Sequence, residues 1–442
     1  DQLRTLCRQA GLHTTVDHEI VGQREDDGQA FSHRMLSVRP TKVTIYCNHI
    51  TGGWDPVAVD RLGASEVAVV QTAEALVNLG VTVTVHQNGA TTVEHNGVCY
   101  VDRATPPAPG ADVLVLFKTL EHIGTKARSR VFWTIDLPTP GQAATWLPPA
   151  ALPDLDAVLC ASEWHRQEVL KACTWLPPDR CLAHWLGVVT DDILDAVAKH
   201  PKVSGRVVYT SSPDRGLDRL LSFWPDIRLA APHAELHVLY GFDFWRRSEA
   251  VVPEDVRKEM VPARTRLEKL LRETPGVVAT GRLPRAEYVR ELAEAEIWVH
   301  PGEGIELCCV AALEAQAARC VPVVVPSMAL SETVQVGLRA MASEDLPSAM
   351  RLALLEGLPG WEGAEGTWKT CTRTTAAVWE QPNWSTLKLP PPADLAACLM
   401  DIAQPKLGVP DGTKPQAAEM PDFGKKIPDR FPMPPRRFEA KH

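Results

Sequence analysis

The sequence lacks the features that mark membrane and secreted proteins. Its 442 residues contain no apolar run near the roughly 20 residues that a helix needs to span a bilayer. Residues 1–4 show no signal-peptide pattern. The eleven cysteines are scattered and odd in number, none has CxxC spacing, and the adjacent Cys308 and Cys309 cannot easily form an unstrained disulfide. We therefore expect reduced thiols in a cytoplasmic protein.

A basic excess is also absent, because the net charge is −9. Proteins that rely on contacts with a phosphate backbone usually carry an excess of lysine and arginine. The balance therefore argues against a nucleic-acid partner and leaves room only for a local basic patch. No Asp-x-Asp signature for a divalent ion ends a predicted strand, since the pairs at 26–27 and 191–192 resemble loop or helix-start acids. We expect no metal and no other cofactor.

Short apolar, β-branched runs alternate with helical patterns along most of the chain. A first group lies at 43–48, 81–86, 112–117, 131–135 and 157–161, and a second at 207–210, 236–240, 277–280, 297–300 and 321–325. Strands that alternate with helices predict parallel sheets covered by helices on both faces. The predicted fold class is α/β, with two Rossmann-like, doubly wound domains that face a cleft.

Composition suggests the domain boundaries. Residues 1–40, which include strand-like stretches, form an N-terminal extension. The first domain covers 41–200, and a break at 200–205 leads into the second, 201–385. Residues 386–442 are rich in proline and poor in apolar side chains, which predicts a tail without a core of its own.

The stretch at 300–318 carries the most information. It reads as a strand end, a glycine loop and an apolar helix that leads into the next strand. Glu306 and Glu314 lie eight residues apart, a little over two helical turns, so both carboxylates are expected on nearly one helix face. Two acids at the mouth of such a unit could hold hydroxyls on two parts of an extended ligand. Paired carboxylates could also serve a hydrolase, which the strand-loop-helix context disfavours.

Two further stretches fit an anionic ligand. Arg215 follows the first strand of the second group and precedes Gly216, where its forked donors suit a pyrophosphate, although a solvated surface arginine is the alternative. Gly63, Ser65 and Glu66 stand at a helix start, where backbone N–H groups can approach a phosphate. Ser65 and Glu66 could instead cap that helix.

Together these stretches resemble a known family. The Gly-x-Ser-Glu run at 63–66, the Arg-Gly-Leu-x-x-Leu-Leu run at 215–221 and the Glu-x7-Glu run at 306–314 resemble retaining, nucleotide-sugar-dependent GT-B glycosyltransferases of group 1, or family 4-like, type. The resemblance covers about residues 41–385, and the Glu-x7-Glu context is its most specific part. It also implies that a late helix of the second domain, around 368–379, crosses back onto the first domain.

The resemblance implies roles for individual residues. Glu306 would contact the donor sugar, Glu314 would hold the ribose hydroxyls, and Arg215 would neutralise the donor diphosphate. The remaining expected donor-binding residues are Gly63, Ser65, Glu66, Ser212, Gly216, Gly241, Arg282, Leu283, Gly304, Ile305, Leu307 and Cys308. The donor would be UDP- or GDP-linked.

The sequence departs from the family at three places. Ile135 stands where many relatives carry a histidine before the acid that follows the fourth strand, here Asp136. A second basic residue for the diphosphate is not obvious, with Arg219 and Arg282 as candidates. Leu307 and its neighbour Cys308 replace the common Gly-Phe-Gly beside the first acid, so the choice of sugar is expected to differ.

The acceptor is expected on the first domain. Asp136 could bind sugar or acceptor as a catalytic residue, and Trp54 and His165 are candidate acceptor-binding residues. A hydrogen-bonded structural role is the alternative for His165. A glycan, a small molecule or DNA could be the acceptor.

The predicted activity is therefore transfer of a sugar from a nucleotide diphosphate sugar to an acceptor hydroxyl, with retention and without a metal. Leaving-group stabilisation would be its main chemical task. Three alternatives keep the fold: a phage-type DNA glycosyltransferase acting on hydroxylated bases, a nucleotide-sugar epimerase, and a catalytically silent binding module. The intact set of Arg215, Glu306 and Glu314 makes the silent module the weakest of these.

Overall fold

The computed structural model describes residues 12–23, 30–48, 54–58, 62–88, 92–250, 252–340, 342–355, 377–380, 387 and 389–402. Within these ranges, every helix is too short or too polar to cross a membrane. Most of the expected tail, 386–442, and most of the expected late helix, 368–379, lie outside the described residues.

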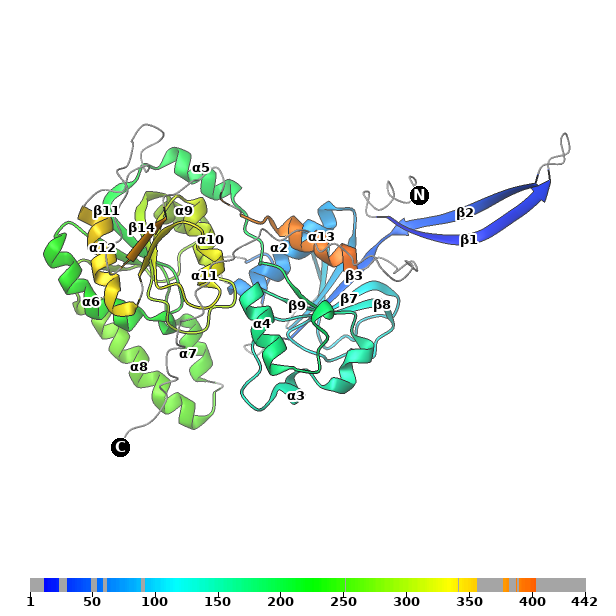
Figure 1. The fold of residues 1–442 in the computed structure, drawn as a ribbon, viewed down its shortest axis with the longest axis horizontal. Helices are drawn as coiled ribbons and strands as arrows, with labels where there is room; N and C mark the ends of the chain where they lie inside the picture. Colours follow the sequence, from blue (N-terminus) through cyan, green and yellow to red (C-terminus); the bar gives the residue numbers. More distant parts are fainter. Residues whose placement is uncertain are drawn as a thin grey trace. The chain divides into compact units, whose positions relative to one another are not determined.

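The first sheet has eight strands in the order β10-β9-β8-β7-β3-β4-β6-β5 (Figure 1). Its strands are β3 (Lys42–Cys47), β4 (Thr82–Gln87), β5 (Val93–His95), β6 (Val98–Asp102), β7 (Ala111–Phe117), β8 (Ala127–Trp133), β9 (Ala157–Cys160) and β10 (Cys181–Ala183). All neighbours pair in parallel except β5 with β6. Because the chain winds outward from β3 in both directions, strand order reverses between β3 and β7.

The second sheet has seven strands in the order β13-β12-β11-β14-β15-β16-β17. They are β11 (Val203–Tyr209), β12 (Glu235–Val238), β13 (Val277–Ala279), β14 (Ala295–His300), β15 (Val321–Val324), β16 (Gly337–Ala340) and β17 (Ala377–Glu380). Only β17 runs antiparallel to its neighbour. Here strand order reverses between β11 and β14.

Helices connect the strands as expected for parallel sheets. The helices of the first domain are α2 (Ala64–Asn78), α3 (Ala143–Trp146) and α4 (Glu163–Ala172), with 3-10 turns η2 (Pro149–Asp154) and η3 (Pro178–Arg180). In the second part lie α5 (Asp191–Lys199), α6 (Leu217–Ala230), α7 (Asp243–Glu249), α8 (Glu254–Glu273), α9 (Arg285–Glu294), α10 (Val310–Ala317), α11 (Leu330–Thr333), α12 (Leu346–Leu355), η4 (Pro213–Arg215) and η5 (Ser343–Asp345), followed by α13 (Pro392–Ile402).

All ten predicted strand runs coincide with strands, which confirms the α/β fold class. The sequence reading did not find β5, β6, β10, β16 and β17, four of which are three to four residues long at or next to a sheet edge, where little apolar surface is needed. In the N-terminal extension, β1 (Leu12–Gln23) and β2 (Ala30–Pro40) form an antiparallel pair of their own, in keeping with the strand-like stretches read there.

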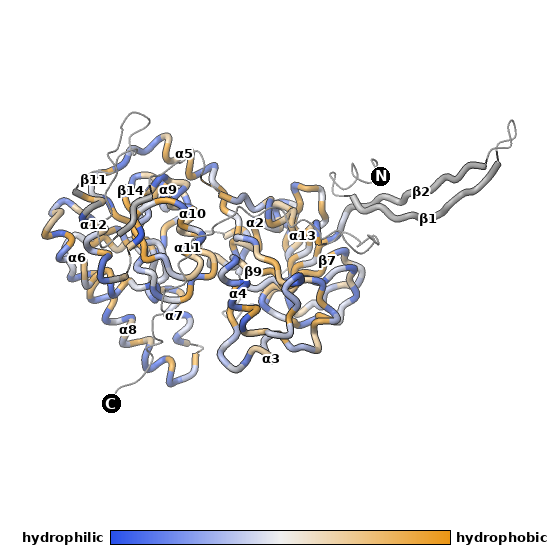
Figure 2. The backbone as a smooth tube through the Cα atoms, in the orientation of Figure 1, coloured by the Kyte–Doolittle hydropathy of each residue, from blue (hydrophilic) through white to orange (hydrophobic). Residues whose placement is uncertain are grey.

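Strand β7 shows why these sheets need helices on both faces. Val113, Val115 and Phe117 belong to one hydrophobic core, and the intervening Leu114 and Leu116 belong to the core on the other face. Every residue of β7 is buried. Burial of each such side chain contributes about 1.5–3 kcal/mol. Along α8, Figure 2 shows hydrophilic stretches interrupted by short hydrophobic ones, and its buried residues, Leu267 and Leu271, lie on one face.

The C-terminal part differs from the boundaries read from sequence. Helix α13 lies within the expected tail, 386–442, yet its Leu395, Ala396 and Leu399 are buried in a core of the first sheet, next to α2. Part of the expected late helix, including Trp379, is instead strand β17. The helix was expected from the family resemblance alone, whereas antiparallel pairing with β16 makes residues 377–380 a strand.

The expected break at 200–205 is not where the chain leaves the first core. Ile193 and Ala196 of α5 are buried in a core of the second sheet beside Val208, and α5 packs on α9. Residues 200–205 therefore belong to the second sheet's domain, and the first core ends before α5.

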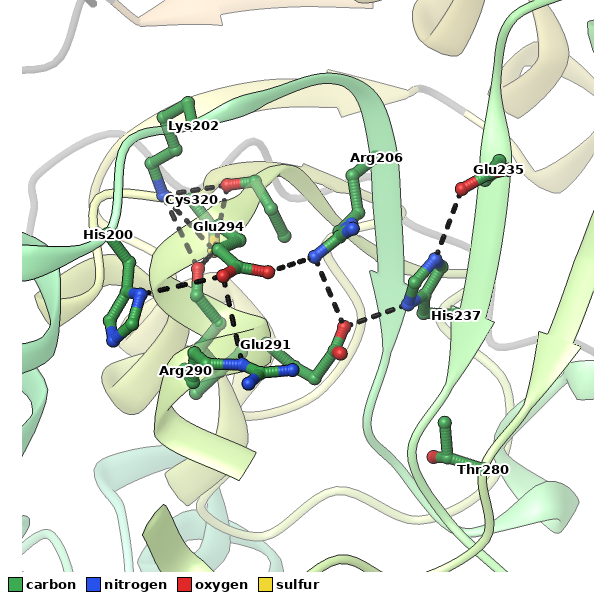
Figure 3. Close-up of polar contacts among 12 residues, drawn as sticks. His200, Lys202, Arg206, Glu235, His237, Thr280, Arg290, Glu291, Glu294 and Cys320 are labelled. Carbon is green, nitrogen blue, oxygen red and sulfur yellow. Dashed lines mark hydrogen bonds and ion pairs between the residues drawn. The ribbon is translucent and has the colours of Figure 1, made fainter. Parts of the chain in front are cut away.

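A charged network attaches α9 to the second sheet (Figure 3). His237 on β12 lies 2.8 Å from Glu291 on α9, through Nδ1 and Oε2. Arg206 on β11 pairs with Glu294 and lies 3.7 Å from Glu291. The Lys202 ammonium donates to two backbone carbonyl oxygens at 2.7 and 2.8 Å. Buried charges are tolerated here because each one meets an opposite charge or a carbonyl.

Candidate functional site

The candidate site lies where strand order reverses in the second sheet. Ligands of open parallel sheets bind beyond the carboxyl ends of the strands at this position. The loop after β11 leads through η4 into α6, and the loop after β14 leads into α10. These two loops contain Arg215 and Glu306, so the topology brings two of the expected site residues to one edge.

Two glycines let these loops pack directly against each other. Gly216 has φ of 94°, and a Cβ there would lie 2.8 Å from the Cβ of Pro301. Gly304 has φ of 73°, and a Cβ there would lie 2.7 Å from Nη1 of Arg215. Both positions therefore need glycine for conformation and for space. The close approach holds the Arg215 side chain against the 301–306 loop.

Arg215 and Glu306 form an ion pair, with Nε 3.3 Å from Oε1. The Arg215 side chain is 26% exposed and that of Glu306 is 13% exposed, so the pair is partly screened from water but can be reached by a ligand. Arg215 also lies 3.3 Å from Asp214. His300 at the end of β14 places its Nε2 3.4 Å from the same Oε1 of Glu306. One carboxylate thus meets two nitrogen groups.

The expected placement of both acids on one helix face is wrong. Helix α10 begins at Val310, with Cys309 as its N-cap residue, so Glu306 lies in the loop before it and only Glu314 is helical. Gly302 and Gly304 both have positive φ values, 78° and 73°, and the loop they form returns Glu306 toward Arg215 before the helix starts. The ion pair with Arg215 and the positive φ values of the two glycines therefore explain why the helix does not begin before Val310.

Glu314 is held by residues that the sequence reading did not select. Tyr288 on α9 donates a 2.8 Å hydrogen bond to its Oε2, and Arg285 at the start of α9 pairs with its Oε1. Arg285 also lies 2.7 Å from Asp192 on α5. Burial and the adjacent carboxylate raise the pKa of Tyr288 well above its usual value, so its hydroxyl stays protonated. A signal existed, because positions 285 and 288 share one face of a helix that follows a strand end.

Other expected donor-binding residues surround the same edge. Ser212 precedes η4, and its carbonyl accepts a 2.7 Å hydrogen bond from Tyr209. A Cβ on Gly241, which follows β12, would lie 3.4 Å from the backbone N of Arg282, so these two loops are neighbours. Leu283 packs on a core of the second sheet.

The residues beside the first acid differ in exposure. Ile305 is 51% exposed, whereas Leu307 is half-buried. Cys308 packs on two hydrophobic clusters, and burial raises its pKa to about 12. That thiol is therefore a packing group at neutral pH, not a nucleophile. Arg219, one candidate for the second diphosphate contact, lies 3.5 Å from Glu303 and also pairs with Glu344.

The glycine loop before α2 has the geometry of a helix entrance. Gly63 is the N-cap residue and has no side chain with which to cap the helix. Ser65 and Glu66 lie in the first turn. A Cβ on Gly63 would lie 2.5 Å from Oε2 of Glu66, so this carboxylate lies beside the helix start. Arg282 donates to the carbonyl of Leu62, directly before this loop.

A second polar group lies at the reversal point of the first sheet. Asp136, expected as catalytic, follows β8 and lies 3.1 Å from Lys118 Nζ, with its own side chain 47% exposed. Lys118 follows β7 and has φ of 59°, an unfavourable value for a residue with a side chain. The amide of Asn48 donates to the Lys118 carbonyl at 3.5 Å. Lys118 was not selected from sequence, and only the sheet order brings it to Asp136.

His165 has both ring nitrogens in use. Its Nδ1 accepts a 3.1 Å hydrogen bond from the N–H of Ala161, so Nε2 carries the proton and donates to the Asp136 carbonyl at 3.0 Å. Burial lowers the pKa of His165 to about 4. The geometry therefore corresponds to the structural alternative, in which His165 positions the Asp136 loop and has no nitrogen left for an acceptor. Trp54, the other expected acceptor contact, packs against the buried Tyr100 with ring centroids 6.1 Å apart.

The ligating atoms of His300, Glu306 and Cys309 lie within 4.8 Å of one another, which makes this the one such group among the described residues. Imidazole, carboxylate and thiolate are zinc ligands in proteins. The hydrogen bonds around His300 decide whether this group suits a metal.

Comparison with solved structures identifies the fold. The chain matches sucrose-phosphate synthase from Thermosynechococcus elongatus (17% identity, TM-score 0.53), covering 82% of this chain and 96% of that one. It matches an α,α-trehalose-phosphate synthase (UDP-forming) from Burkholderia vietnamiensis at 12% identity and TM-score 0.51, covering 71% and 89%. AviGT4, a glycosyltransferase involved in avilamycin A biosynthesis, matches at 16% and 0.50, covering 82% and 97%.

These likenesses show that the chain has the GT-B glycosyltransferase fold. No protein-family model matches the sequence, and no curated protein matches it by sequence. The fold expectation is confirmed, and the residue roles remain predictions.

Proposed function

We propose that the protein is a glycosyltransferase that moves a sugar from a nucleotide diphosphate sugar to an acceptor hydroxyl. The observation that carries this proposal is the Arg215–Glu306 ion pair at the reversal point of the second sheet. A cation beside a hydroxyl-binding carboxylate matches the two halves of a sugar diphosphate. The GT-B fold supports the proposal, as does the description of one similar structure as a UDP-forming synthase.

Each site residue has a proposed task. Arg215 would stabilise the charge that develops on the nucleotide diphosphate as it leaves, in place of a metal ion. Glu306 would accept hydrogen bonds from the donor sugar, and Glu314, supported by Arg285 and Tyr288, would accept them from the ribose hydroxyls. Transfer with retention of the anomeric configuration is part of the proposal.

The acceptor is proposed to bind on the first domain near Asp136 and Lys118. Asp136 would hold an acceptor or sugar hydroxyl with its exposed carboxylate.

A cytoplasmic location is also proposed, on the ground that the nine described cysteines are all free thiols.

The test is a screen of UDP- and GDP-linked sugars for nucleotide release, read by mass spectrometry, with thermal shift to report binding. Arg215→Ala and Glu306→Ala should each lower release by about a hundredfold or more, since loss of one group that stabilises leaving-group charge typically costs that much. Arg257→Ala, which removes an ion-paired arginine of α8, is the matched control and should keep full activity. Full activity in Arg215→Ala or Glu306→Ala would contradict the site.

Two further measurements, of donor isomerisation and of DNA binding, separate the alternatives. An epimerase would convert the donor to an isomer of equal mass without releasing nucleotide or needing an acceptor. A DNA glycosyltransferase would bind duplex DNA with an affinity that falls steeply with salt. The C-terminal tail contains two basic pairs, at 425–426 and 436–437, which would favour DNA binding and lie outside the described residues.

A further inference from the structure

We infer that His300 is a positioning residue for Glu306. The imidazole of His300 is held in the tautomer whose Nε2–H donates a hydrogen bond to the carboxylate, and the other carboxylate oxygen is left for the ligand. The inference rests on the proposed function for its catalytic meaning, while its hydrogen-bonding basis stands on the geometry alone.

The tautomer follows from one hydrogen bond. The backbone N–H of Gly302 donates to Nδ1 of His300 at 3.0 Å, and the imidazole is fully buried. A nitrogen that accepts an N–H bond carries no proton, so in the neutral ring the proton is on Nε2. Nε2 lies 3.4 Å from Oε1 of Glu306 and is therefore the donor of that contact.

The ring has little freedom to turn over. It lies beside the indole of Trp298, with ring centroids 5.6 Å apart, and that indole donates a 2.8 Å hydrogen bond to Thr210. A flip of the imidazole would place a carbon against the Gly302 N–H and leave a buried donor without an acceptor. The local packing and the Gly302 bond thus maintain one orientation.

The consequence falls on Glu306. Arg215 Nε lies 3.3 Å and His300 Nε2 lies 3.4 Å from Oε1 of Glu306. Among the described residues, these are the side-chain contacts of the Glu306 carboxylate, and both are made to Oε1. Oε2 is therefore available to a sugar hydroxyl. One hydrogen bond and one ion pair to the same oxygen restrict rotation of the carboxylate, which is what pre-organisation of a binding group requires.

The same geometry argues against a metal at His300, Glu306 and Cys309. A histidine that ligates a metal usually donates its second ring N–H to an acceptor. Here the second nitrogen accepts from Gly302, so a metal at Nε2 would have to displace the proton and leave an imidazolate. Arg215, 3.3 Å from the same carboxylate, adds electrostatic repulsion toward a cation.

Two substitutions separate the two hydrogen bonds. In His300→Asn, the amide oxygen lies near the position of Nδ1 and can accept from Gly302, but the side chain is too short to reach Glu306. In His300→Gln, the amide nitrogen extends to the position of Nε2 and can still donate to Glu306. With the best donor from the screen, we expect kcat/KM to fall about ten- to a hundredfold in His300→Asn, the range for a hydrogen bond to a charged group, and to recover substantially in His300→Gln. Binding of UDP alone should be unchanged in both.

A spectroscopic measurement tests the tautomer of His300 without an activity assay. Long-range proton–nitrogen NMR on the nitrogen-15-labelled full chain should give His300 as the Nε2–H form, assigned by its absence from the His300→Asn spectrum. Detection of the Nδ1–H form would overturn the inference. Equal activity of His300→Asn and the unchanged protein would also overturn the inference. The proposed function is tested separately, by the activities of Arg215→Ala and Glu306→Ala.

Zinc alone is the remaining probe. Equilibrium dialysis should show no stoichiometric zinc that depends on His300 and Cys309. Stoichiometric binding that is lost in Cys309→Ser would assign these residues to a metal site and reject the positioning role.

Discussion

The hydroxyl of Tyr288 donates a 2.8 Å hydrogen bond to Oε2 of Glu314, while Arg285 pairs with Oε1 of the same carboxylate. Glu314 is only 13% exposed, so it is a partly buried acid whose two oxygens are both oriented by α9. A carboxylate fixed in this way can present its remaining lone pairs to neighbouring hydroxyls without reorganisation.

Replacement of Tyr288 by phenylalanine should lower the free energy of unfolding by about 1.5–3 kcal/mol, because a hydrogen bond to a charged acceptor is lost. Tyr100→Phe is the matched control, since the hydroxyl of the buried Tyr100 finds no hydrogen-bond partner among the residues that the structure describes. That control should be neutral or stabilising. Chemical denaturation of both variants gives the comparison, and equal losses would contradict the role of the Tyr288 hydroxyl.

Glu314→Gln should weaken nucleotide binding through the ribose. A neutral amide accepts less strongly than a carboxylate, so affinity for UDP should fall about tenfold. Calorimetry with UDP and with 2′,3′-dideoxy-UDP isolates the ribose contribution. The unchanged protein should prefer UDP, and Glu314→Gln should lose most of that preference. If both proteins discriminate equally, Glu314 does not hold the ribose.

Gly216→Ala should destabilise the protein and displace Arg215. An alanine would add about 1–2 kcal/mol for the left-handed backbone, and its Cβ would lie 2.8 Å from that of Pro301, which adds a steric cost of about 1–3 kcal/mol. Gly110→Ala is a close control, because φ there is 96° and no atom lies within 4 Å of the added carbon. Denaturation curves should show the larger loss at Gly216, and similar losses would remove the argument from loop packing.

The Glu291–His237 contact should make stability fall in acid. The hydrogen bond from His237 holds the pKa of Glu291 below its usual value. Because the pKa is depressed in the folded state, the stabilisation is present above the unfolded pKa of roughly 4.3 and is lost as the pH falls through the folded pKa. Glu291→Gln should therefore reduce the fall in the free energy of unfolding that occurs as the pH drops below about 4.3. Glu287→Gln, on the same helix but outside the network of Figure 3, should keep the slope of the unchanged protein.

Leu399→Ala should cost about 2–5 kcal/mol, because Leu399 of α13 is buried in the core of the first sheet. Leu229→Ala changes a residue of α6 that is 83% exposed and should stay within about 0.5 kcal/mol. Denaturation of the two variants tests whether α13 belongs to the first domain's core. A cost at Leu399 as small as that at Leu229 would return residues 392–402 to a weakly attached tail.

The strands and the site loops could be predicted from the sequence for different reasons. A strand buried on both faces, such as β7, must be apolar along its whole length, so its composition predicts it. Glu306, Arg215 and Gly216 were readable because a family pattern of glycine and charge surrounds them. Tyr288 and Lys118 carry no such pattern, since their partners lie 26 and 18 residues away in sequence.

The sequence by itself determined the α/β class, the ten main strands and the loops that carry the charged residues, because hydrophobic periodicity and glycine placement are local properties. The tertiary structure decided the remainder. It moved Glu306 out of the helix and onto Arg215, directed Glu314 to Arg285 and Tyr288, and oriented His300 through the Gly302 N–H. It also placed α13 in the first core. These outcomes depend on which loops the sheet order brings together, and such long-range pairing leaves no periodic signal in the chain.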